Sequence, residues 1–190
     1  MNILILNASP RHKGNISSML GAMEEEAVQR GASVNCLRVA DLQVKACTGC
    51  MACRSRQVCV LPEDDAQRIV EMIKTCDVLI IGAPCYWGNM PGQLKVLFDR
   101  MVYALIGEGL RAIPQPLHKG KQAVLVSTCT TPFPFNILFN QSSGTIKALK
   151  GILKWSGFRV KAVVERGGTR QKTIGPKDLD RCRKAVRKVL

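Results

Sequence analysis

The chain has 190 residues, of which 46% are hydrophobic and 22% are charged. This composition suits one domain with a substantial core and excludes a disordered chain. The net charge of +14 is concentrated towards the C-terminus, where residues 147–190 hold fourteen Lys and Arg against three acidic residues.

Short apolar runs alternate with longer amphipathic stretches along the whole chain. We expect strands at 2–7, 33–39, 77–84, 121–129 and 158–165, and helices at 15–31, 62–76, 91–105, 143–157 and 175–190. Strict alternation of this kind predicts an α/β fold with a doubly wound, five-stranded parallel sheet in three α/β/α layers. Residues 1–190 are expected to form a single domain, with irregular loops at 106–120 and 130–142.

The sequence offers no sign of a membrane segment or a secretion signal. No run approaches the roughly 18 apolar residues of a membrane span, and the opening NILILN is too short for a signal peptide. We therefore expect a cytoplasmic protein without membrane contact. Disulfides are rare in a reducing cytosol, so the nine cysteines favour metal binding or redox chemistry over a disulfide framework.

The basic charge near the C-terminus has two interpretations. It can be a solvated surface, or it can attract an anionic cofactor or an acidic redox partner. Nucleic acid is not an expected partner, because aromatic residues make up only 5% of the chain and no nucleic-acid motif accompanies the charge.

The loop after the first strand, ASPRHKGNISS, has the composition of an anion site. Hydroxyls, a guanidinium and free N–H groups at a helix start suit a phosphate. The residues concerned are Ser9, Arg11, Gly14, Asn15, Ser17 and Ser18. The pattern is neither a Rossmann fingerprint nor a P-loop, and a polar turn that caps the helix remains the alternative.

The loop after the third strand, APCYWGNMPG, predicts a tight turn beside a flat ligand. Tyr86 and Trp87 would cover the ligand, and Gly88 would allow close approach of the backbone. The alternative is that both aromatic residues are ordinary, half-buried loop residues.

Together, SPRHKGN and PCYWGNMPGQLKVLFDR resemble the NADPH-dependent FMN reductase and iron–sulfur flavoprotein family, whose fold is flavodoxin-like. The similarity runs from Met1 to about residue 105. The resemblance implies that FMN is the cofactor, with its phosphate held by Ser9, Arg11, Asn15 and Ser17. It also implies that the isoalloxazine is lined by Pro84, Tyr86, Trp87, Gly88, Asn89 and Met90, with Thr128 on the far side. Ile16 departs from the family pattern, which has Ser or Thr there.

Four cysteines lie within thirteen residues, spaced C-x2-C-x2-C-x5-C. They are Cys47, Cys50, Cys53 and Cys59, in a cysteine-rich loop that we place at 45–60. Four thiolates suit either zinc or a [4Fe–4S] cluster, and consecutive C-x2-C units are the spacing typical of ferredoxin-like cluster sites. The segment also resembles the cysteine motif of iron–sulfur flavoproteins. Metal-free thiols or a disulfide remain alternatives.

The remaining cysteines are expected to have no chemical role. Cys36 and Cys76 fall in predicted secondary structure and are expected in the core, and Cys85 is expected to be a packing residue. Hydrolytic chemistry has no convincing base, since the chain contains only His12 and His118.

The resemblance implies an FMN-dependent oxidoreductase that takes electrons from NAD(P)H or a ferredoxin-like donor and passes them to an unknown acceptor. The alternative is a non-enzymatic electron carrier or redox sensor. Relatives of this kind associate as homodimers or homotetramers, and the cysteine-rich loop of one subunit could then serve the flavin of another.

Overall fold

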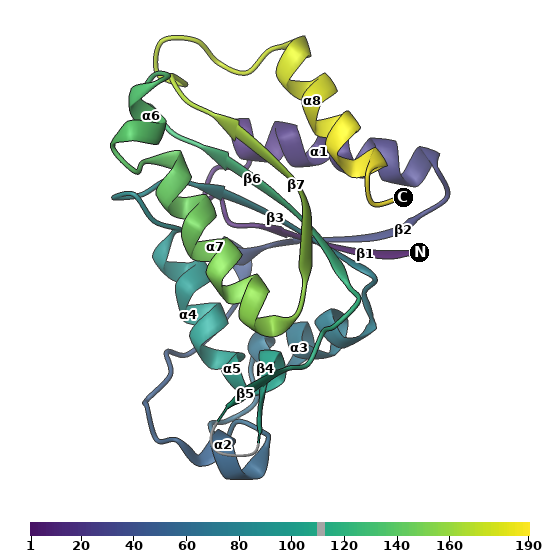
Figure 1. The fold of residues 1–190 in the computed structure, drawn as a ribbon, viewed down its shortest axis with the longest axis vertical. Helices are drawn as coiled ribbons and strands as arrows, with labels where there is room; N and C mark the ends of the chain where they lie inside the picture. Colours follow the sequence, from purple (N-terminus) through teal and green to yellow (C-terminus); the bar gives the residue numbers. More distant parts are fainter. Residues whose placement is uncertain (110–112) are drawn as a thin grey trace.

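The computed structural model describes residues 1–109 and 113–190, and its centre is a five-stranded parallel sheet (Figure 1). The strand order is β2-β1-β3-β6-β7, with β1 at Asn2–Asn7, β2 at Ser33–Arg38, β3 at Val78–Pro84, β6 at Gln122–Thr128 and β7 at Arg159–Arg166. This order is that of flavodoxin-like sheets. The predicted fold class is therefore confirmed.

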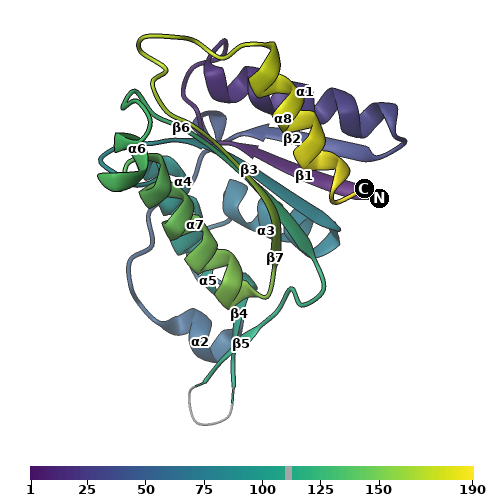
Figure 2. The same cartoon turned by 45° about the horizontal axis from the view of Figure 1, so that its top comes forward.

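Helices cover both faces of the sheet, as Figures 1 and 2 show from two directions. One face packs against α1 (Asn15–Gln29) and α8 (Pro176–Arg187), and the other against α3 (Asp65–Thr75), α4 (Gly92–Arg100) and α7 (Ser142–Ser156). Alternate residues of one strand serve the two cores: Ile3 and Ile5 face α1, whereas Leu4 and Leu6 face α3. Burial on both faces explains why the central strands are continuous apolar runs.

Two helices differ from the predicted boundaries for local reasons. The helix expected to begin at Pro62 begins at Asp65, because Asp64 forms a capping box with Gln67. The helix expected over 91–105 is divided at Met101 into α4 and a short α5 (Val102–Leu105).

Two segments expected to be irregular contain secondary structure. Within 106–120, β4 (Ile106–Glu108) pairs in antiparallel fashion with β5 (Pro114–Pro116), while residues 110–112 lie outside the described part of the chain. Within 130–142, the short helix α6 (Phe135–Leu138) forms. The prediction of irregular structure was therefore wrong for these short elements.

Three smaller features complete the fold. A 3-10 turn (Val39–Asp41) follows β2, and α2 (Ala52–Arg56) lies inside the cysteine-rich loop. Cys76 is buried as expected, but Cys36 is exposed, because β2 is an edge strand with largely solvent-accessible side chains. None of the helices in the described ranges combines the length and apolar character that a bilayer crossing requires.

Candidate functional site

The first loop is held in shape by its own polar side chains. Asn7, the last residue of β1, accepts the Ser9 N–H at 3.0 Å and donates its amide to Ser17 Oγ at 3.0 Å. Ser17 Oγ in turn donates to the Arg11 carbonyl at 3.0 Å. These bonds fold the loop back over the start of α1.

The start of α1 is left open to an anion. Gly14 occupies the N-cap position, and no side chain within the described residues caps the helix there. The N–H groups of the first turn therefore keep their donor capacity, and the helix dipole favours negative charge at this end. Arg11 is exposed beside this helix end, where its guanidinium can reach a ligand.

The third loop forms a tight two-residue turn. The Tyr86 N–H donates to the Asn89 carbonyl at 2.9 Å, and the Asn89 N–H donates to the Tyr86 carbonyl at 3.0 Å. The two residues between them have positive φ, 54° at Trp87 and 69° at Gly88, which is the combination of a type I′ turn. A left-handed tryptophan is uncommon, and such residues cluster at ligand sites.

The turn is pressed against the start of α7, and glycine is needed on both sides of this contact. A Cβ at Gly88 would lie 2.8 Å from the Asn140 carbonyl oxygen, and one at Gly144 would lie 2.1 Å from the Gly88 carbonyl oxygen. Thr145 Oγ1 also donates to the Asn89 carbonyl at 3.0 Å. The position of the turn is therefore fixed by backbone packing.

The first loop and the third loop meet in one pocket of about 140 Å³ at the carboxyl ends of the strands. Its lining residues are Ser9, Arg11, Gly14, Asn15, Ile16, Pro84, Cys85, Tyr86, Thr128, Cys129, Thr130 and Thr169. Six of the eleven residues predicted to bind FMN are among them. The pocket is smaller than the roughly 300–1,000 Å³ usual for cofactor sites, so part of a mononucleotide would extend beyond it.

The other five predicted residues lie around this pocket. Ser17 shapes the first loop and Met90 is buried in the core. Asn89 is exposed, and its side chain accepts the Met90 N–H. Trp87 is fully exposed, and with Gly88 it lines a separate hollow against Phe139.

Thr169 is a pocket residue that the sequence analysis missed. It follows β7, and its hydroxyl donates to the Cys129 carbonyl at 3.0 Å. Its only signal in the sequence was its place shortly after the carboxyl end of the fifth strand.

The cysteine-rich loop runs away from this pocket. Figures 1 and 2 place its helix α2 at the opposite end of the molecule from α6. Cys47 and Cys50 are exposed, whereas Cys53 and Cys59 are partly buried against the core. Among residues 1–109 and 113–190, no three His, Cys, Asp or Glu side chains lie close enough together to hold a metal ion.

Two acidic residues and one arginine fix the base of this loop. Asp64 Oδ2 accepts the Lys45 N–H at 3.1 Å, and Asp65 Oδ2 accepts the Gln43 N–H at 2.8 Å. Arg100, whose side chain is completely buried, donates from Nη1 to the Lys45 carbonyl and to Asp64 Oδ2, both at 2.7 Å. These contacts therefore fix both ends of the loop, where it follows the 3-10 turn and where it leads into α3.

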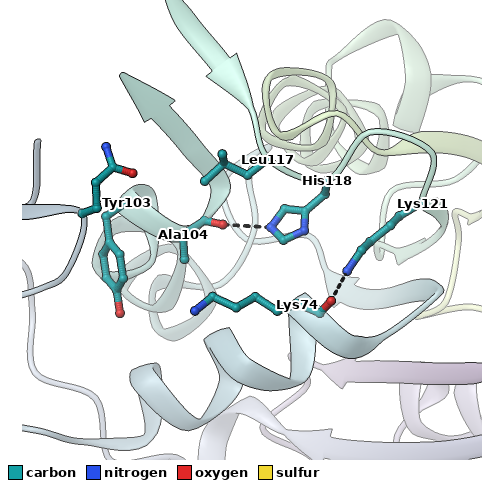
Figure 3. Close-up of a pocket in the computed structure, with 7 residues that line it drawn as sticks. Lys74, Tyr103, Ala104, Leu117, His118 and Lys121 are labelled. Carbon is teal, nitrogen blue, oxygen red and sulfur yellow. Dashed lines mark hydrogen bonds between the residues drawn. The ribbon is translucent and has the colours of Figure 1, made fainter. Parts of the chain in front are cut away.

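A larger hollow of about 380 Å³ lies beside the cysteine-rich loop, where Gln57 and Tyr103 contribute to its wall (Figure 3). The ring of His118 is buried there, contacts the Ala104 carbonyl at 2.8 Å through Nε2, and packs 5.1 Å from Phe158. Burial lowers the pKa of His118 below its ordinary value. Lys121 Nζ donates to the Ile73 and Lys74 carbonyls at the end of α3. These contacts give His118 and Lys121 a structural role, which is to hold neighbouring segments together.

Comparison with known proteins places the chain in a family. The family model for NADPH-dependent FMN reductase matches residues 1–134. An iron–sulfur flavoprotein of Methanosarcina thermophila is 39% identical over 102 residues, 54% of this chain and 53% of the relative. One from Methanocaldococcus jannaschii is 27% identical over 177 residues, 87% of each chain. The chain spans about half the length of the curated relatives that it matches at 31–39% identity.

Solved structures agree on the fold. An NAD(P)H:quinone oxidoreductase from Methanothermobacter marburgensis has a TM-score of 0.71 at 22% identity, covering 98% of this chain and 94% of the other. An FMN-dependent NADH-azoreductase from Bacillus anthracis, solved in complex with FMN, has a TM-score of 0.73 at 16% identity, with coverage of 97% and 95%. On its sequence match and its fold, this chain belongs to the NADPH-dependent FMN reductase family.

Proposed function

We propose that the chain is a single FMN-binding domain that acts as an oxidoreductase, taking electrons from NAD(P)H or a ferredoxin-like donor. The observation that carries this proposal is the pocket in which the open start of α1 meets the type I′ turn. A bound FMN supplies hydride acceptance and one-electron transfer. The protein supplies the binding and orientation.

The residues present suit that group. Uncapped N–H groups of α1, with Arg11 and Ser9 beside them, suit the phosphate. Pro84, Tyr86 and Thr128 come from the ends of two neighbouring strands and suit a ring laid across them. Because the pocket is small, the ring would lie largely open on the side of Tyr86, which is 45% exposed.

We further propose that the cysteine-rich loop assembles a [4Fe–4S] cluster on Cys47, Cys50, Cys53 and Cys59. The support is the spacing of the thiols and the names of relatives such as the iron–sulfur flavoprotein of Methanosarcina thermophila. In the described conformation the four thiols are not gathered, so cluster assembly would draw the exposed Cys47 and Cys50 towards the partly buried pair. Such coupling of metal binding to local folding is common.

We propose that the protein works as a homodimer or homotetramer. In Figures 1 and 2, helix α2 of the cysteine-rich loop lies at the opposite end of the molecule from the start of α1, whose first residues line the flavin pocket. Large apolar side chains are exposed on the type I′ turn and on residues 133–139, which follow the pocket residue Thr130 in the chain; they are Trp87, Phe133, Phe135, Leu138 and Phe139. Exposed apolar patches of this kind mark interaction surfaces. Association through them would cover the open flavin and allow the loop of one subunit to approach the flavin of another.

A second candidate is an electron carrier without NAD(P)H oxidation of its own. The basic residues near the C-terminus support it, because they would attract an acidic redox protein such as a ferredoxin. Anaerobic stopped-flow separates the candidates. Bleaching of the flavin by NADPH or NADH alone supports the oxidoreductase, and bleaching only by reduced ferredoxin supports the carrier.

The cluster proposal has its own test. Protein purified without oxygen should contain iron and sulfide and absorb visible light beyond the flavin spectrum. Cys50→Ser should lose both, whereas Cys36→Ser, which changes an exposed thiol outside the loop, should keep both. A parent protein with a pure flavin spectrum and no iron would contradict the cluster while leaving the FMN proposal intact.

A further inference from the structure

The hollow between Trp87 and Phe139 has a volume of about 530 Å³, which lies within the roughly 300–1,000 Å³ usual for small-molecule sites. We call it the Trp87 hollow. Its wall comes from the type I′ turn, from residues 139–141 and from the first two turns of α7, and Figures 1 and 2 show α6 beside this end of α7. Among the described residues it shares no lining side chain with the flavin pocket.

Two aromatic rings and one cation line the Trp87 hollow. Trp87 is fully exposed and Phe139 is 65% exposed, so both rings are available to a flat ligand. Lys147 is exposed on the second turn of α7. The surrounding sequence supplies no counter-charge, because residues 109–164 contain no Asp or Glu whereas residues 141–164 contain five basic residues. Flat apolar faces beside a positive charge suit a planar ring that carries an anionic group.

The backbone around the hollow is held in place before any ligand arrives. Trp87 and Asn140 line it from two sides, and both are left-handed with a φ of 54°. Non-glycine residues in this conformation cluster at ligand sites. The close approach of Gly88 to the Asn140 carbonyl joins the two sides, and Gln141 Nε2 donates to the Phe139 carbonyl at 3.2 Å. The hollow is therefore preformed.

The Trp87 hollow and the flavin pocket lie on two sides of one wall. Cys85 lines the pocket and Gln141 lines the hollow, and the Cys85 sulfur lies 3.8 Å from Gln141 Oε1. The type I′ turn is shared in the same way, with Tyr86 in the pocket and Gly88 in the hollow. A ligand in the hollow is therefore separated from the flavin pocket by one tight turn.

We propose that the Trp87 hollow binds a planar aromatic ring that carries an anionic group, with Trp87 and Phe139 contacting the ring and Lys147 pairing with the anion. The inference rests on the proposed function and deepens it, because it names the class of ligand held next to the flavin. Two participants in that function have this chemistry. One is the adenosine phosphate end of NADPH, and the other is an electron acceptor that is an aromatic acid.

The probes are adenosine 2′,5′-bisphosphate, which copies the NADPH end, and naphthalene-2-sulfonate, a redox-inert aromatic acid. Each is titrated by calorimetry into the FMN-loaded protein as it assembles in solution, because Trp87 and Phe139 are also among the side chains proposed for subunit contacts. Lys147→Gln should weaken binding of the recognised probe about tenfold or more. Lys150→Gln is the matched control, because it removes the same charge from an exposed position of α7 that does not line the hollow.

A second pair of variants tests the contact with the ring. Phe139→Ala should weaken binding about fivefold or more, because a stacking surface is lost. Phe133→Ala, which changes an exposed ring outside the hollow, should leave binding unchanged. FMN affinity should be the same in all four variants, because none of the substituted residues lines the flavin pocket.

The two probes separate the two sources of the ligand. Binding of the bisphosphate assigns the hollow to the NADPH end, and binding of the sulfonate alone assigns it to an aromatic acid acceptor. Binding of neither probe overturns the inference, and so does binding that Lys147→Gln and Lys150→Gln weaken equally. None of these measurements needs electron transfer. A chain whose flavin is bleached by NADPH but which binds neither probe therefore contradicts this inference alone and leaves the proposed function intact.

Discussion

Arg100 Nη1 and Asp64 Oδ2 lie 2.7 Å apart beneath the cysteine-rich loop, and they join the end of α4 to the residue that caps α3. The same two side chains hold the backbone of Lys45: Asp64 accepts its N–H, and Arg100 donates to its carbonyl. One buried ion pair therefore links two helices to the base of a loop that carries four thiols.

Breaking this pair should be far more damaging than breaking an exposed one. Asp64→Asn keeps a helix-capping residue but leaves Arg100 buried without a counter-charge, so we expect a loss of about 3 kcal/mol or more in the free energy of unfolding. Asp99→Asn breaks the exposed Lys95–Asp99 pair and should change the free energy of unfolding by less than about 1 kcal/mol. Urea unfolding measures both, and similar losses in the two variants would contradict the role of the buried pair.

Arg11→Ala should weaken FMN binding by about tenfold or more, because a charge-assisted hydrogen bond to phosphate is lost. Lys13→Ala is the matched control: it removes one positive charge from the same loop, but Lys13 does not line the pocket. Fluorescence titration of the apoprotein with FMN measures both dissociation constants. If the two variants bind FMN equally well, the phosphate lies elsewhere.

The contact between the type I′ turn and α7 predicts opposite effects for two glycines of one helix. Gly144→Ala would place a methyl group 2.1 Å from the Gly88 carbonyl oxygen, so the turn must move, and both FMN affinity and thermal stability should fall. Gly151→Ala meets nothing within 4 Å and should stabilise α7 by up to about 1 kcal/mol. Thermal unfolding and FMN titration check the pair. A fully functional, fully stable Gly144→Ala protein would show that the turn is not fixed by this packing.

Glu26 links α1 to α8 and should make the free energy of unfolding depend on pH. It receives hydrogen bonds from Arg187, at 2.8 and 3.1 Å, and from Arg30, and these lower its pKa from 4.5 to about 2. A group with a lowered pKa stabilises the folded state above its unfolded pKa, and this contribution disappears as the pH falls through the folded pKa.

The stability difference between the parent and Glu26→Gln should therefore be largest above about pH 4.5 and should shrink towards pH 2. Glu25→Gln, at an exposed position with one distant partner, should show almost no difference at any pH. Denaturant unfolding at several pH values checks this. A Glu26→Gln difference that stays constant across the range would contradict the ion-pair explanation.

The regular parts of the fold could be predicted because the hydrophobic pattern of each segment's own residues indicates its secondary structure. The apolar run of β1 and the amphipathic stretch of α1 were placed within two residues of their observed bounds. The pair β4–β5 could not be predicted, because each strand has only three residues and Pro114 and Pro116 argue against a strand. Such elements depend on tertiary neighbours.

The site was predicted in its parts but not in its arrangement. Motifs placed Arg11 and Tyr86 at strand ends, and these two residues do share a pocket. The direction of the cysteine-rich loop was not predictable, because it depends on the contact between Asp64 and Arg100, which are separated by 36 residues. The outward side chain of Trp87 likewise follows from the handedness of its turn.

The central claim is that FMN binds where the first loop meets the third. The most direct measurement is an anaerobic titration of the flavin-free protein with FMN, in which quenching of flavin fluorescence reports binding. We expect saturation at one FMN per chain, with riboflavin binding much more weakly because it lacks the phosphate. A protein that leaves FMN fluorescence unchanged, or that binds riboflavin as tightly as FMN, would contradict the account.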